Sequence, residues 1–403
     1  MIVAHRGASG DAPENTLAAC EAAIAQGADV IELDVRRTAD GELVVFHDND
    51  LVRTTDAKQV FPDRSPWRVR DFTFAELRRL DAGRWNDERH AGQRIPTLDE
   101  SLDLVGDRVG LLIELKRPSE DEHLLGALAS CLDRHGRGGS GDGVDDRVGG
   151  GVVVASIERA YVSRYKELHP ETTVAALTVR AHTELSELEE IARYAAFIGT
   201  GQARFPQEHV ERVHALGLGV LTNTSTAADV REMTALGVDG VVTDYPARMV
   251  TALRNEHALW IEAEALLERC RSSCPMEVQP NKGMNGGKWS GDAQLLIVAT
   301  GRGDTVELTF DSGGHGARNL ALTVTASPEG GIYQLSVDGD PLGPPVDTYR
   351  PAVARQTLDF PDLRLADGTH VLHARVTGKN PQSTGHTLGL DVLELRTPGS
   401  ARA

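Results

Sequence analysis

The stretch of sequence that decides the fold begins with Ile2-Val-Ala-His5-Arg6-Gly7 at the start of the chain. A second apolar run, Val30-Ile-Glu32-Leu-Asp34-Val, and a third, Leu43-Val-Val-Phe-His47-Asp48, follow it. Histidines, an arginine and carboxylates therefore lie in or at the end of strand-like sequence. Because α/β barrels carry their chemistry at the ends of their strands, this pattern predicts a functional site.

Short β-rich runs alternate with helix-like segments up to about residue 257, which is typical of a parallel sheet with crossover helices. The predicted strands are Ile2–His5, Val30–Val35, Leu111–Leu115, Val152–Ala155, Thr173–Leu177, Ala196–Ile198, Gly219–Leu221 and Gly240–Thr243. The predicted helices are Thr16–Gln26, Leu98–Val105, Glu120–His135, Glu158–Glu167, Glu184–Tyr194, Pro206–Ala215, Ala227–Ala235 and Pro246–Glu256. Eight such units predict an α/β TIM barrel, (β/α)8. An open doubly wound sheet, the alternative, would carry a glycine-rich turn after its first strand.

Two interruptions break this alternation. Residues 42–96 hold a hairpin-like run and then a polar stretch with several aromatic side chains, too long for an ordinary connection. We interpret residues 48–96 as an insertion that covers the catalytic face of the barrel. Residues 136–151 are dominated by glycine and aspartate, so they predict a mobile loop without chemistry.

Beyond residue 257 the helical periodicity disappears, and short alternating strands bounded by Gly, Asp, Asn and Pro replace it. The predicted strands include residues 306–310, 320–324, 332–337, 370–376 and 388–395. The pattern predicts an all-β sandwich of the jelly-roll type. We therefore expect two domains, a barrel over residues 1–257 and a sandwich over residues 258–397.

The composition suits this division and narrows the function. The chain has 403 residues, 40% of them hydrophobic, and a formal net charge of −18, which argues against a nucleic acid partner. Four cysteines predict no disulfide framework, and no apolar run approaches the ~20 residues of a transmembrane segment. Because no export signal precedes the first strand, we expect a cytoplasmic protein as written; a mature or truncated form could instead be secreted.

Three carboxylates of the first domain predict a metal site. Glu32 and Asp34 are two residues apart on one strand and so project to the same face, and Glu114 ends another apolar run. Converging carboxylates need a neutralising cation, and an all-oxygen ligand set favours magnesium or calcium over zinc. The alternative is that Glu32 and Asp34 are ion-pair partners of Arg36 or Arg37.

Two histidines and two cations complete the predicted site. His5 and His47 each end an apolar run and are the candidate general acid and base, because histidine titrates near neutral pH. Arg6 and Lys116 supply positive charge at the same place, and such cations beside a divalent ion suit a phosphate diester. Arg6 could instead serve only as a partner of Glu14.

A set of motifs from residue 5 to residue 246 resembles the glycerophosphodiester phosphodiesterase family. They are His5-Arg6-Gly7, Pro13-Glu14-Asn15-Thr16, Glu32-Leu33-Asp34, Thr38-Ala-Asp-Gly41, His47-Asp48, Ile95-Pro96-Thr97-Leu98, Ile113-Glu114-Leu115-Lys116 and Val242-Thr243-Asp244-Tyr245-Pro246. The resemblance covers residues 1 to about 255 and implies a TIM barrel that hydrolyses glycerophosphodiesters to glycerol 3-phosphate and an alcohol.

The resemblance also implies roles for the residues that match. It makes His5 and His47 the acid/base pair. It makes Glu32, Asp34 and Glu114 the metal ligands. Arg6 and Lys116 then contact the substrate phosphate. One departure is visible in the seventh-strand motif, where the family often has tryptophan and this chain reads Gly219-Val-Leu221-Thr-Asn223. The departure concerns contacts with the alcohol rather than the hydrolysis.

The second domain resembles carbohydrate-binding β-sandwich modules of the galactose-binding-like type. The motifs are Ile261-Glu262-Ala263-Glu264, Gly286-Gly-Lys-Trp289-Ser-Gly291, residues 333–339, Gly378-Lys-Asn-Pro381 and Gly389-Leu-Asp391. The resemblance implies a glycan or cell-wall polymer as partner and a structural calcium ion held by Glu262, Glu264 and Asp391. Aromatic side chains at positions 289, 333 and 349 could stack on a sugar or fill the core. The sandwich could instead pack on the barrel or mediate self-association.

Three functions therefore compete. The first is a metal-dependent phosphodiesterase that a glycan-binding module directs to its substrate. The second is a phospholipase D-like enzyme acting on lysophospholipid or sphingomyelin headgroups, which an apolar cleft beside His47 would favour. The third is a binding protein without catalysis, which the complete set of histidines and carboxylates argues against.

Overall fold

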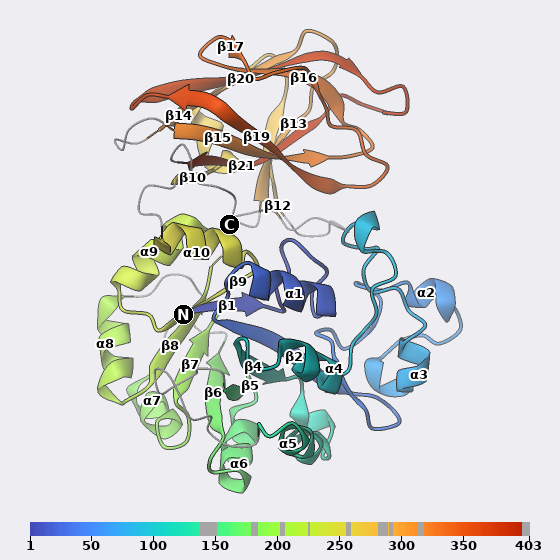
Figure 1. Ribbon diagram of the computed structural model, residues 1–403, viewed down its shortest axis with the longest axis vertical. Helices are drawn as coiled ribbons and strands as arrows, with labels where there is room; N and C mark the ends of the chain where they lie inside the picture. The colour runs from blue at the N-terminus through green and yellow to red at the C-terminus, as the bar shows by residue number, and fades with distance from the viewer. Residues whose placement is uncertain are drawn as a thin grey trace. The chain divides into compact units, whose positions relative to one another are not determined.

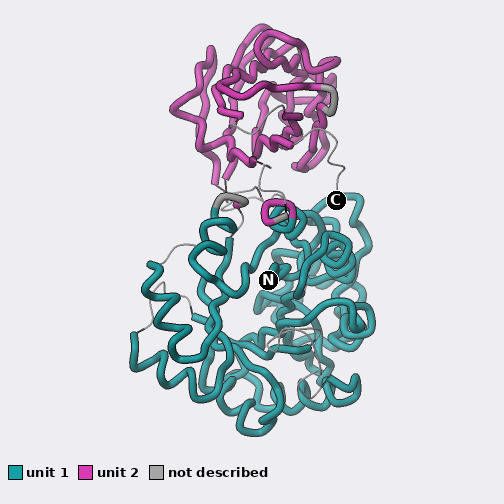
Figure 2. The backbone as a smooth tube through the Cα atoms, turned by 60° about the vertical axis from the view of Figure 1, so that its left-hand side comes forward, with its two compact units in different colours: residues 1–225, 229–250 teal, residues 226–228, 251–403 magenta. Residues whose placement is uncertain are grey.

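The computed structural model describes residues 1–137, 151–178, 184–201, 206–224, 226–254, 259–280, 289, 293–312 and 318–396. The chain divides into two compact units, Met1–Ser225 with Asp229–Val250, and Thr226–Ala228 with Thr251–Ala403 (Figure 2). The predicted boundary between residues 257 and 258 lies outside the described residues, and so does most of the loop predicted at 136–151.

The first unit contains the predicted barrel. Its parallel strands are β1 Ile2–His5, β2 Val30–Arg37, β4 Gly110–Leu115, β5 Val152–Ser156, β6 Thr173–Thr178, β7 Phe197–Thr200, β8 Gly219–Asn223 and β9 Gly240–Thr243. Each pairs with the next, and β1 closes the ring because it pairs with both β2 and β9 (Figure 1). The prediction of a TIM barrel is therefore confirmed, and an open doubly wound sheet is excluded.

Helices form the outer layer of the barrel (Figure 1). They are α1 Leu17–Ala25, α4 Leu98–Val105, α5 Leu124–Arg134, α6 Arg159–Leu168, α7 Leu185–Ile191, α8 Gln207–Ala215, α9 Ala227–Ala235 and α10 Pro246–Arg254. The predicted helix start at Glu120 is wrong, because Pro118–Glu120 forms a separate 3-10 turn, η3. In α4, Leu98, Leu102 and Val105 face the core, and a capping box at Thr97 starts the helix.

Alternation along the strands separates two apolar regions of the barrel. Side chains of one face meet inside it: Val3, Val30, Leu112, Val153, Ala155, Ala175, Phe197, Leu221 and Val242. On β2, the intervening Ile31, Leu33 and Val35 pack in the cluster that includes the helices. Glu32 and Asp34 share the inward face of Val30, so the same alternation directs both carboxylates into the barrel.

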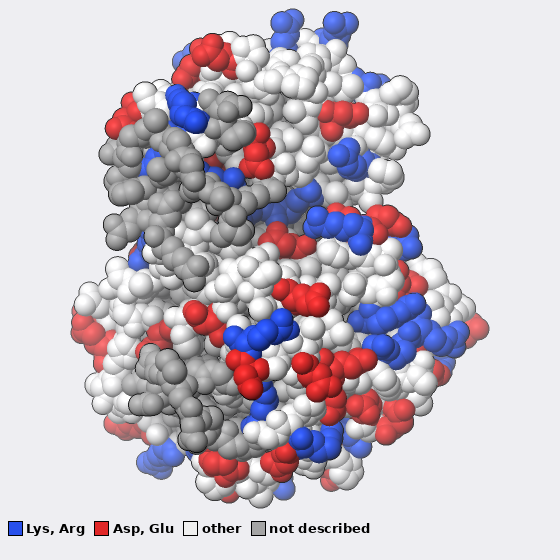
Figure 3. Space-filling view, in the orientation of Figure 1, with Lys and Arg blue, Asp and Glu red and all other residues white. Residues whose placement is uncertain are grey.

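The segment after β2 has a small core of its own. Strand β3, Leu43–Val45, pairs antiparallel with β2 and is followed by α2 Ala57–Val60, η1 Val69–Asp71, α3 Phe74–Leu77 and η2 Glu88–His90. Phe72 and Leu77 are fully buried in a cluster formed by this segment. Guanidinium groups cover its rings: Arg64 lies 4.3 Å from the centre of Phe72, and Arg79 lies 4.7 Å from that of Phe61. Basic side chains gather on the side of α2 and α3 in Figure 3.

The second unit consists of two antiparallel sheets. One contains β10 Leu259–Glu262, β12 Met276–Pro280, β13 Ala293–Ile297, β15 Arg318–Ala326, β19 Ala354–Leu365 and β21 Leu388–Arg396. The other contains β11 Cys270–Ser272, β14 Thr305–Asp311, β16 Gly331–Val337, β17 Asp340–Pro341, β18 Val346–Asp347 and β20 Thr369–Lys379. Both sheets contribute to one apolar cluster, with Leu322 and Leu393 from the first and Leu308 and Leu372 from the second.

Two aromatic residues of this unit fill its core. Trp289 and Tyr333 are each 1% exposed. The indole nitrogen of Trp289 donates to Thr325 Oγ1 at 2.8 Å, and the Tyr333 hydroxyl donates to the carbonyl of His386. Neither ring is therefore available as an exposed platform for a sugar. All four cysteines of the chain are free thiols, and among the described residues no helix has the length and apolar character needed to cross a membrane.

Candidate active site

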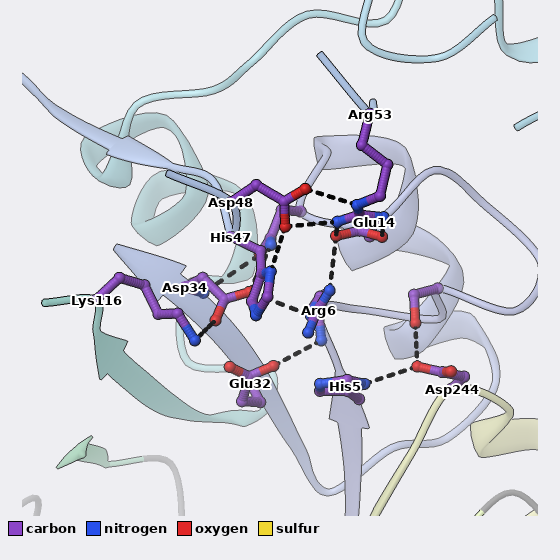
Figure 4. Close-up of polar contacts among 12 residues, drawn as sticks. His5, Arg6, Glu14, Glu32, Asp34, His47, Asp48, Arg53, Lys116 and Asp244 are labelled. Atoms are coloured by element: carbon purple, nitrogen blue, oxygen red, sulfur yellow. Dashed lines mark hydrogen bonds and ion pairs between the residues drawn. The ribbon is translucent and has the colours of Figure 1, made fainter. Parts of the chain in front are cut away.

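Strand register brings the predicted residues together at the mouth of the barrel. On β1 and β2, His5 lies beside Glu32, and on β2 and β4, Asp34 lies beside Glu114. Lys116 comes directly after β4. Figure 4 shows histidine, carboxylate, arginine and lysine side chains of this region turned toward one another.

The three carboxylates form one compact group. Oxygen atoms of Glu32, Asp34 and Glu114 all lie within 4.8 Å of one another. Oε1 of Glu32 is buried and has no hydrogen-bond partner among the described residues. Burial, followed by the charges of Asp34 and Glu114, raises the pKa of Glu32 well above its ordinary value. No cationic side chain of the described residues lies within ion-pair distance of Glu32, and the cluster offers the oxygen ligands that a hard divalent cation prefers.

Arg6 and Lys116 neutralise part of the cluster. Nζ of Lys116 lies 2.8 Å from Oε1 of Glu114 and 3.3 Å from Oδ1 of Asp34. Nε of Arg6 lies 3.2 Å from Oδ2 of Asp34, while its Nη1 lies 2.7 Å from Oε1 of Glu14. Burial alone would raise the pKa of Asp34, but Arg6 and Lys116 lower it to about 2. Arg6 therefore pairs with Glu14 and also contacts the cluster.

The alternative pairing of the strand carboxylates with Arg36 or Arg37 is wrong. Arg36 donates through Nε and Nη2 to the backbone carbonyl of His47, at 3.0 and 2.7 Å. Nη1 of Arg37 lies 3.2 Å from Oδ1 of Asp121. Arg36 thus holds the loop that carries His47.

His5 is oriented by a carboxylate from the last strand of the barrel. Its Nδ1 lies 2.7 Å from Oδ1 of Asp244, which follows β9 and also accepts a hydrogen bond from Ser9 Oγ at 2.5 Å. A carboxylate can only accept, so we place the ring hydrogen on Nδ1. Nε2 is then the nitrogen that can accept or release a proton.

His47 is oriented in the same way. Its Nδ1 lies 2.6 Å from Oδ1 of Asp48. Arg53 Nε donates to Oδ2 of Asp48 at 2.6 Å, and Arg53 Nη1 donates to Oε2 of Glu14 at 2.8 Å. Burial would raise the pKa of Asp48, yet its bonds to His47 and Arg53 hold that pKa well below the usual range. Both histidines thus have a carboxylate on Nδ1, which fixes the tautomer and orientation of the ring.

Two residues at the site have left-handed backbone conformations. Arg6 and Asn15 both have φ of 58°, a region that non-glycine residues rarely adopt. The Arg6 N–H donates to Glu32 Oε2 at 2.8 Å, and Asn15 Nδ2 donates to Asp34 Oδ2 at 2.8 Å. Gly7, with φ of 79°, approaches α1 so closely that an added Cβ would lie 2.6 Å from a backbone atom there. The unusual backbone thus holds both strand carboxylates in place.

Three residues of this site were not assigned a role from sequence. Asp48 and Asp244 belong to two motifs of the family resemblance, and an acidic residue at the end of a strand was the only sign in the sequence that either could act at the site. Arg53 lies in the insertion assigned to residues 48–96, where no helix or strand periodicity shows which way a side chain points. Its position became evident only from the fold.

A small pocket opens beside His5 at the mouth of the barrel. Its volume is about 150 Å³. Polar lining comes from His5, Glu32, Glu114, Thr178, Thr200 and Asn223, and apolar lining from Leu112, Ile157, Leu177, Leu221 and Val242. A few polar groups among apolar side chains are typical of a site for a small molecule.

Known proteins are similar to this chain over the part that forms the barrel. The family model for the glycerophosphoryl diester phosphodiesterase family matches residues 5–248. A glycerophosphodiester phosphodiesterase of Bacillus subtilis is 34% identical over 264 residues, which cover 61% of this chain and 84% of the relative. A second, from Caldanaerobacter subterraneus, is 32% identical over 261 residues, which cover 63% of this chain and 98% of the relative.

Solved structures are similar over the same part of the chain. A phosphodiesterase of Oleispira antarctica in complex with its product, sn-glycerol-3-phosphate, superposes with a TM-score of 0.55 at 29% identity, over 63% of this chain and 97% of that one. A glycerophosphodiester phosphodiesterase of Agrobacterium tumefaciens gives a TM-score of 0.50 at 31% identity, over 62% and 98% of the two chains. The chain belongs to the glycerophosphoryl diester phosphodiesterase family and is an enzyme of that class.

Proposed function

We propose that the chain hydrolyses glycerophosphodiesters to glycerol 3-phosphate and an alcohol with the help of a divalent cation and two histidines. The observation that supports this most is the pairing of each histidine with a carboxylate through Nδ1, at 2.7 and 2.6 Å, beside a cluster of three carboxylates. Hydrolysis of a phosphodiester needs proton transfer and neutralisation of the phosphate charge. The histidines suit the first need and a cation at the carboxylate cluster the second, and both lie at the mouth of the barrel.

The carboxylate cluster fits a divalent cation. Oε1 of Glu32 has no hydrogen-bond partner among the described residues, and its neighbours Asp34 and Glu114 are also acidic. Glu32, Asp34 and Glu114 would hold magnesium or calcium. When bound, the cation would supply positive charge that stabilises the phosphate oxygens in the transition state. Lys116, which lies 2.8 Å from Glu114, would then be released toward substrate.

Arg6 and Lys116 would contact the substrate phosphate. Both lie at the cluster, and both are held near Asp34, at 3.2 and 3.3 Å. Guanidinium and ammonium groups neutralise phosphate oxygens and orient the diester for attack. Arg6 is fixed by Glu14 at 2.7 Å, so it would orient the phosphate with little loss of side-chain freedom.

His5 and His47 would move the protons. One Nε2 would accept the proton of the attacking oxygen, and the other would donate a proton to the departing alkoxide. Asp244 and Asp48 would stabilise the imidazolium that forms on each ring. A substrate whose leaving group needs no protonation should rescue only the variant that lacks the acid, which assigns the two roles.

The experiment that tests this proposal is an assay of the full-length protein. Glycerophosphocholine, glycerophosphoethanolamine, glycerophosphoglycerol and lysophospholipids would be supplied with magnesium or calcium, and release of glycerol 3-phosphate measured. The pocket of about 150 Å³ favours the short diesters over the phospholipase D-like alternative. Cleavage of lysophospholipid alone would reverse this order, and full activity in excess chelator would remove the cation from the mechanism.

We also infer that the second unit is a β-sandwich that binds a glycan or cell-wall polymer. Its two sheets share one apolar cluster, and a groove of about 780 Å³ lies within the unit. The lining of this groove includes Asp347, Gln356, Asp359 and Phe360. Polar groups beside an aromatic ring suit a sugar. Calorimetry with soluble cell-wall polysaccharides should detect binding that Phe360→Ala weakens, and equal binding by that variant would refute the groove as the site.

A calcium ion in the second unit would bind Glu262 and Glu264 more readily than Asp391. Burial, with added repulsion from Glu262 and Asp391, raises the pKa of Glu264 to about 8, so a cation would relieve this crowding of acids. Asp391 pairs with Arg355, at 2.8 Å between Oδ2 and Nη2, and would become a ligand only after leaving that arginine. Calcium should raise the melting temperature of this unit in the wild type and not in Glu264→Gln.

A further inference from the structure

A second group of metal-ligand side chains lies where α4 meets α5. Asp99 and Asp103 are four residues apart on α4, and Cys131 on α5 is four residues before His135, the C-cap of that helix. Residues four apart share one face of a helix. Each of the two helices therefore presents a pair of ligand-type side chains to the other.

Interatomic distances place these groups in mutual contact. The Cys131 thiol donates to Oδ2 of Asp99 at 3.5 Å, and Nε2 of His135 lies 2.8 Å from Oδ1 of the same carboxylate. Nδ1 of His135 lies 3.4 Å from Oδ1 of Asp103. Sulfur, nitrogen and oxygen atoms of Asp99, Cys131 and His135 all fall within 4.8 Å of one another.

The burial of this cluster distinguishes it from an ordinary ion pair on the protein surface. Cys131 is fully buried, and the His135 side chain is 18% exposed. Asp99 also forms an ion pair with Arg134 at 3.0 Å. If Asp99 served only in a surface ion pair, Arg134 alone would be enough as its partner. A surface ion pair requires neither the thiol nor a second carboxylate on the far nitrogen of the imidazole. A carboxylate on that nitrogen is, however, the usual companion of a histidine that binds a metal through the other.

We propose that Cys131 Sγ, His135 Nε2 and the Asp99 carboxylate form a zinc site that joins α4 to α5, with Asp103 orienting His135 through Nδ1. Thiolate and imidazole ligands favour zinc over magnesium or calcium. In a tetrahedral zinc site with bonds of about 2.0–2.3 Å, neighbouring ligand atoms lie roughly 3.4 Å apart. The distance of 3.5 Å from Cys131 Sγ to Asp99 Oδ2 matches that spacing, and the 2.8 Å hydrogen bond from His135 Nε2 to Asp99 Oδ1 would lengthen when the ion replaces it. As the zinc–sulfur bond forms, the thiol loses its proton to solvent, and water completes the coordination.

The position of this site gives it a structural role. In the chain, α4 and α5 flank β4, the strand that carries Glu114. An ion shared by the two helices would fix both connections of that strand. The Arg134 side chain is 59% exposed, so it can leave Asp99 for solvent when a cation binds.

Cobalt as a probe for zinc distinguishes this site from the barrel mouth. The chelator-treated full-length protein, with its thiols reduced, would be titrated with Co²⁺ and followed by absorption. Only a thiolate ligand gives a sulfur-to-cobalt charge-transfer band, and the cluster at Glu32 contains no sulfur. We expect the band to saturate at an intensity that corresponds to one thiolate-bound cobalt per chain, and zinc to abolish it and raise the melting temperature.

Matched variants decide the ligands. Cys131→Ser and His135→Gln should each lose the band and show a smaller zinc-dependent rise in melting temperature than the wild type, whereas Asp103→Asn should weaken binding by about 10–100-fold. Cys20→Ser, which removes another buried thiol on α1, is the control and should keep the band. No band in the wild type, or a band that persists in both Cys131→Ser and His135→Gln, would overturn the proposal. Because the readout is spectroscopic, it is independent of phosphodiesterase activity.

Discussion

At the scale of single residues, Glu32 differs from the other two carboxylates of the cluster, because no cationic side chain of the described residues lies within ion-pair distance of it. It is 5% exposed, one of its oxygens lacks a hydrogen-bond partner among the described residues, and its pKa is raised mainly by burial. Asp34, two residues on, has Arg6, Lys116 and Asn15 around it. This inequality identifies Glu32 as the carboxylate that gains most from a bound cation.

The first prediction concerns Glu32→Gln. We expect turnover to fall by at least ~100-fold, because a metal ligand is lost. Stability of the chelator-treated protein at neutral pH should be unchanged or higher, because a buried acidic group is replaced by a neutral one. Turnover and denaturant unfolding would be measured together. A chelator-treated variant clearly less stable than wild type would show that Glu32 is held by contacts other than a cation.

The second prediction concerns the carboxylates behind the histidines. Asp48→Asn and Asp244→Asn should each lower kcat by about 10–100-fold with little change in KM, because the imidazoles lose orientation and charge stabilisation. The pH profile of kcat should shift as well. Asp121→Asn, which removes a partner of Arg37 outside the histidine pairs, is the control and should leave kcat unchanged.

The third prediction is a pH dependence of stability in the second unit. Nδ1 of His370 lies 2.6 Å from Asp338 and Nε2 lies 2.9 Å from the Ala366 carbonyl, and although burial lowers its pKa, these acceptors raise it overall. The folded state therefore holds the proton more tightly than the unfolded state. The added stability is full below the ordinary pKa of about 6.5 and is lost as pH rises through the folded value.

Calorimetry between pH 6 and 8 would test this. The melting temperature of the second unit should fall less steeply in His370→Gln and in Asp338→Asn than in the wild type. Identical slopes in all three proteins would contradict the linkage.

Sequence predicted the residues that face the barrel mouth but not the partners that orient them. Residue type and strand periodicity were sufficient for Glu32 and Asp34, because alternation fixes the face. Asp244 contacts His5 across 239 positions of sequence, and no local pattern reports a contact of that kind. Arg53 was missed for the same reason.

At the scale of elements, the segment after β3 is the part whose stability matters most for the site. It contains Arg53, which donates hydrogen bonds to Glu14 and Asp48. Its apolar side chains pack in a small cluster around Phe72 rather than in the main barrel core. Small cores have little stability in reserve. The segment is therefore expected to unfold locally before the barrel does.

The fourth prediction is that Phe72→Ala destabilises this segment by about 3–5 kcal/mol, as expected for loss of a fully buried aromatic side chain. Proteolysis should then cut within residues 48–96, and kcat should fall because Arg53 is no longer held. Phe74→Ala, at a partly buried position of the same cluster, should have a smaller effect. Equal protease resistance of both variants would show that the segment is stabilised from elsewhere.

Elements with regular periodicity were predictable, and irregular ones were not. Strands β1 and β9 and helix α4 have the predicted bounds, because apolar spacing and capping residues mark them. Strand β19, Ala354–Leu365, was not predicted, since Pro361 interrupts its pattern. The short helices α2 and α3 were also missed, because four residues carry no periodicity.

At the scale of the whole molecule, the two units carry separate apolar cores. Every residue proposed to act in catalysis lies in the first unit. The fifth prediction is therefore that a chain ending at Arg254 folds and hydrolyses glycerophosphocholine within about twofold of the full-length rate, with weaker action only on polymeric substrate. Turnover on both substrates would be compared. An insoluble or inactive truncated chain would show that the second unit completes the barrel.

The ring of strands closes between β1 and β9, with Val3 aligned to Val242. This pairing joins the first few residues of the barrel to nearly the last, and the His5–Asp244 contact lies at the same seam. During synthesis, the strand that carries His5 emerges before the other barrel strands and must wait for β9 before it gains its second neighbour. Catalytic competence should therefore appear in one late step, so that a ribosome-bound chain shorter than the barrel carries an incomplete acid/base pair and cannot attack phosphodiesters.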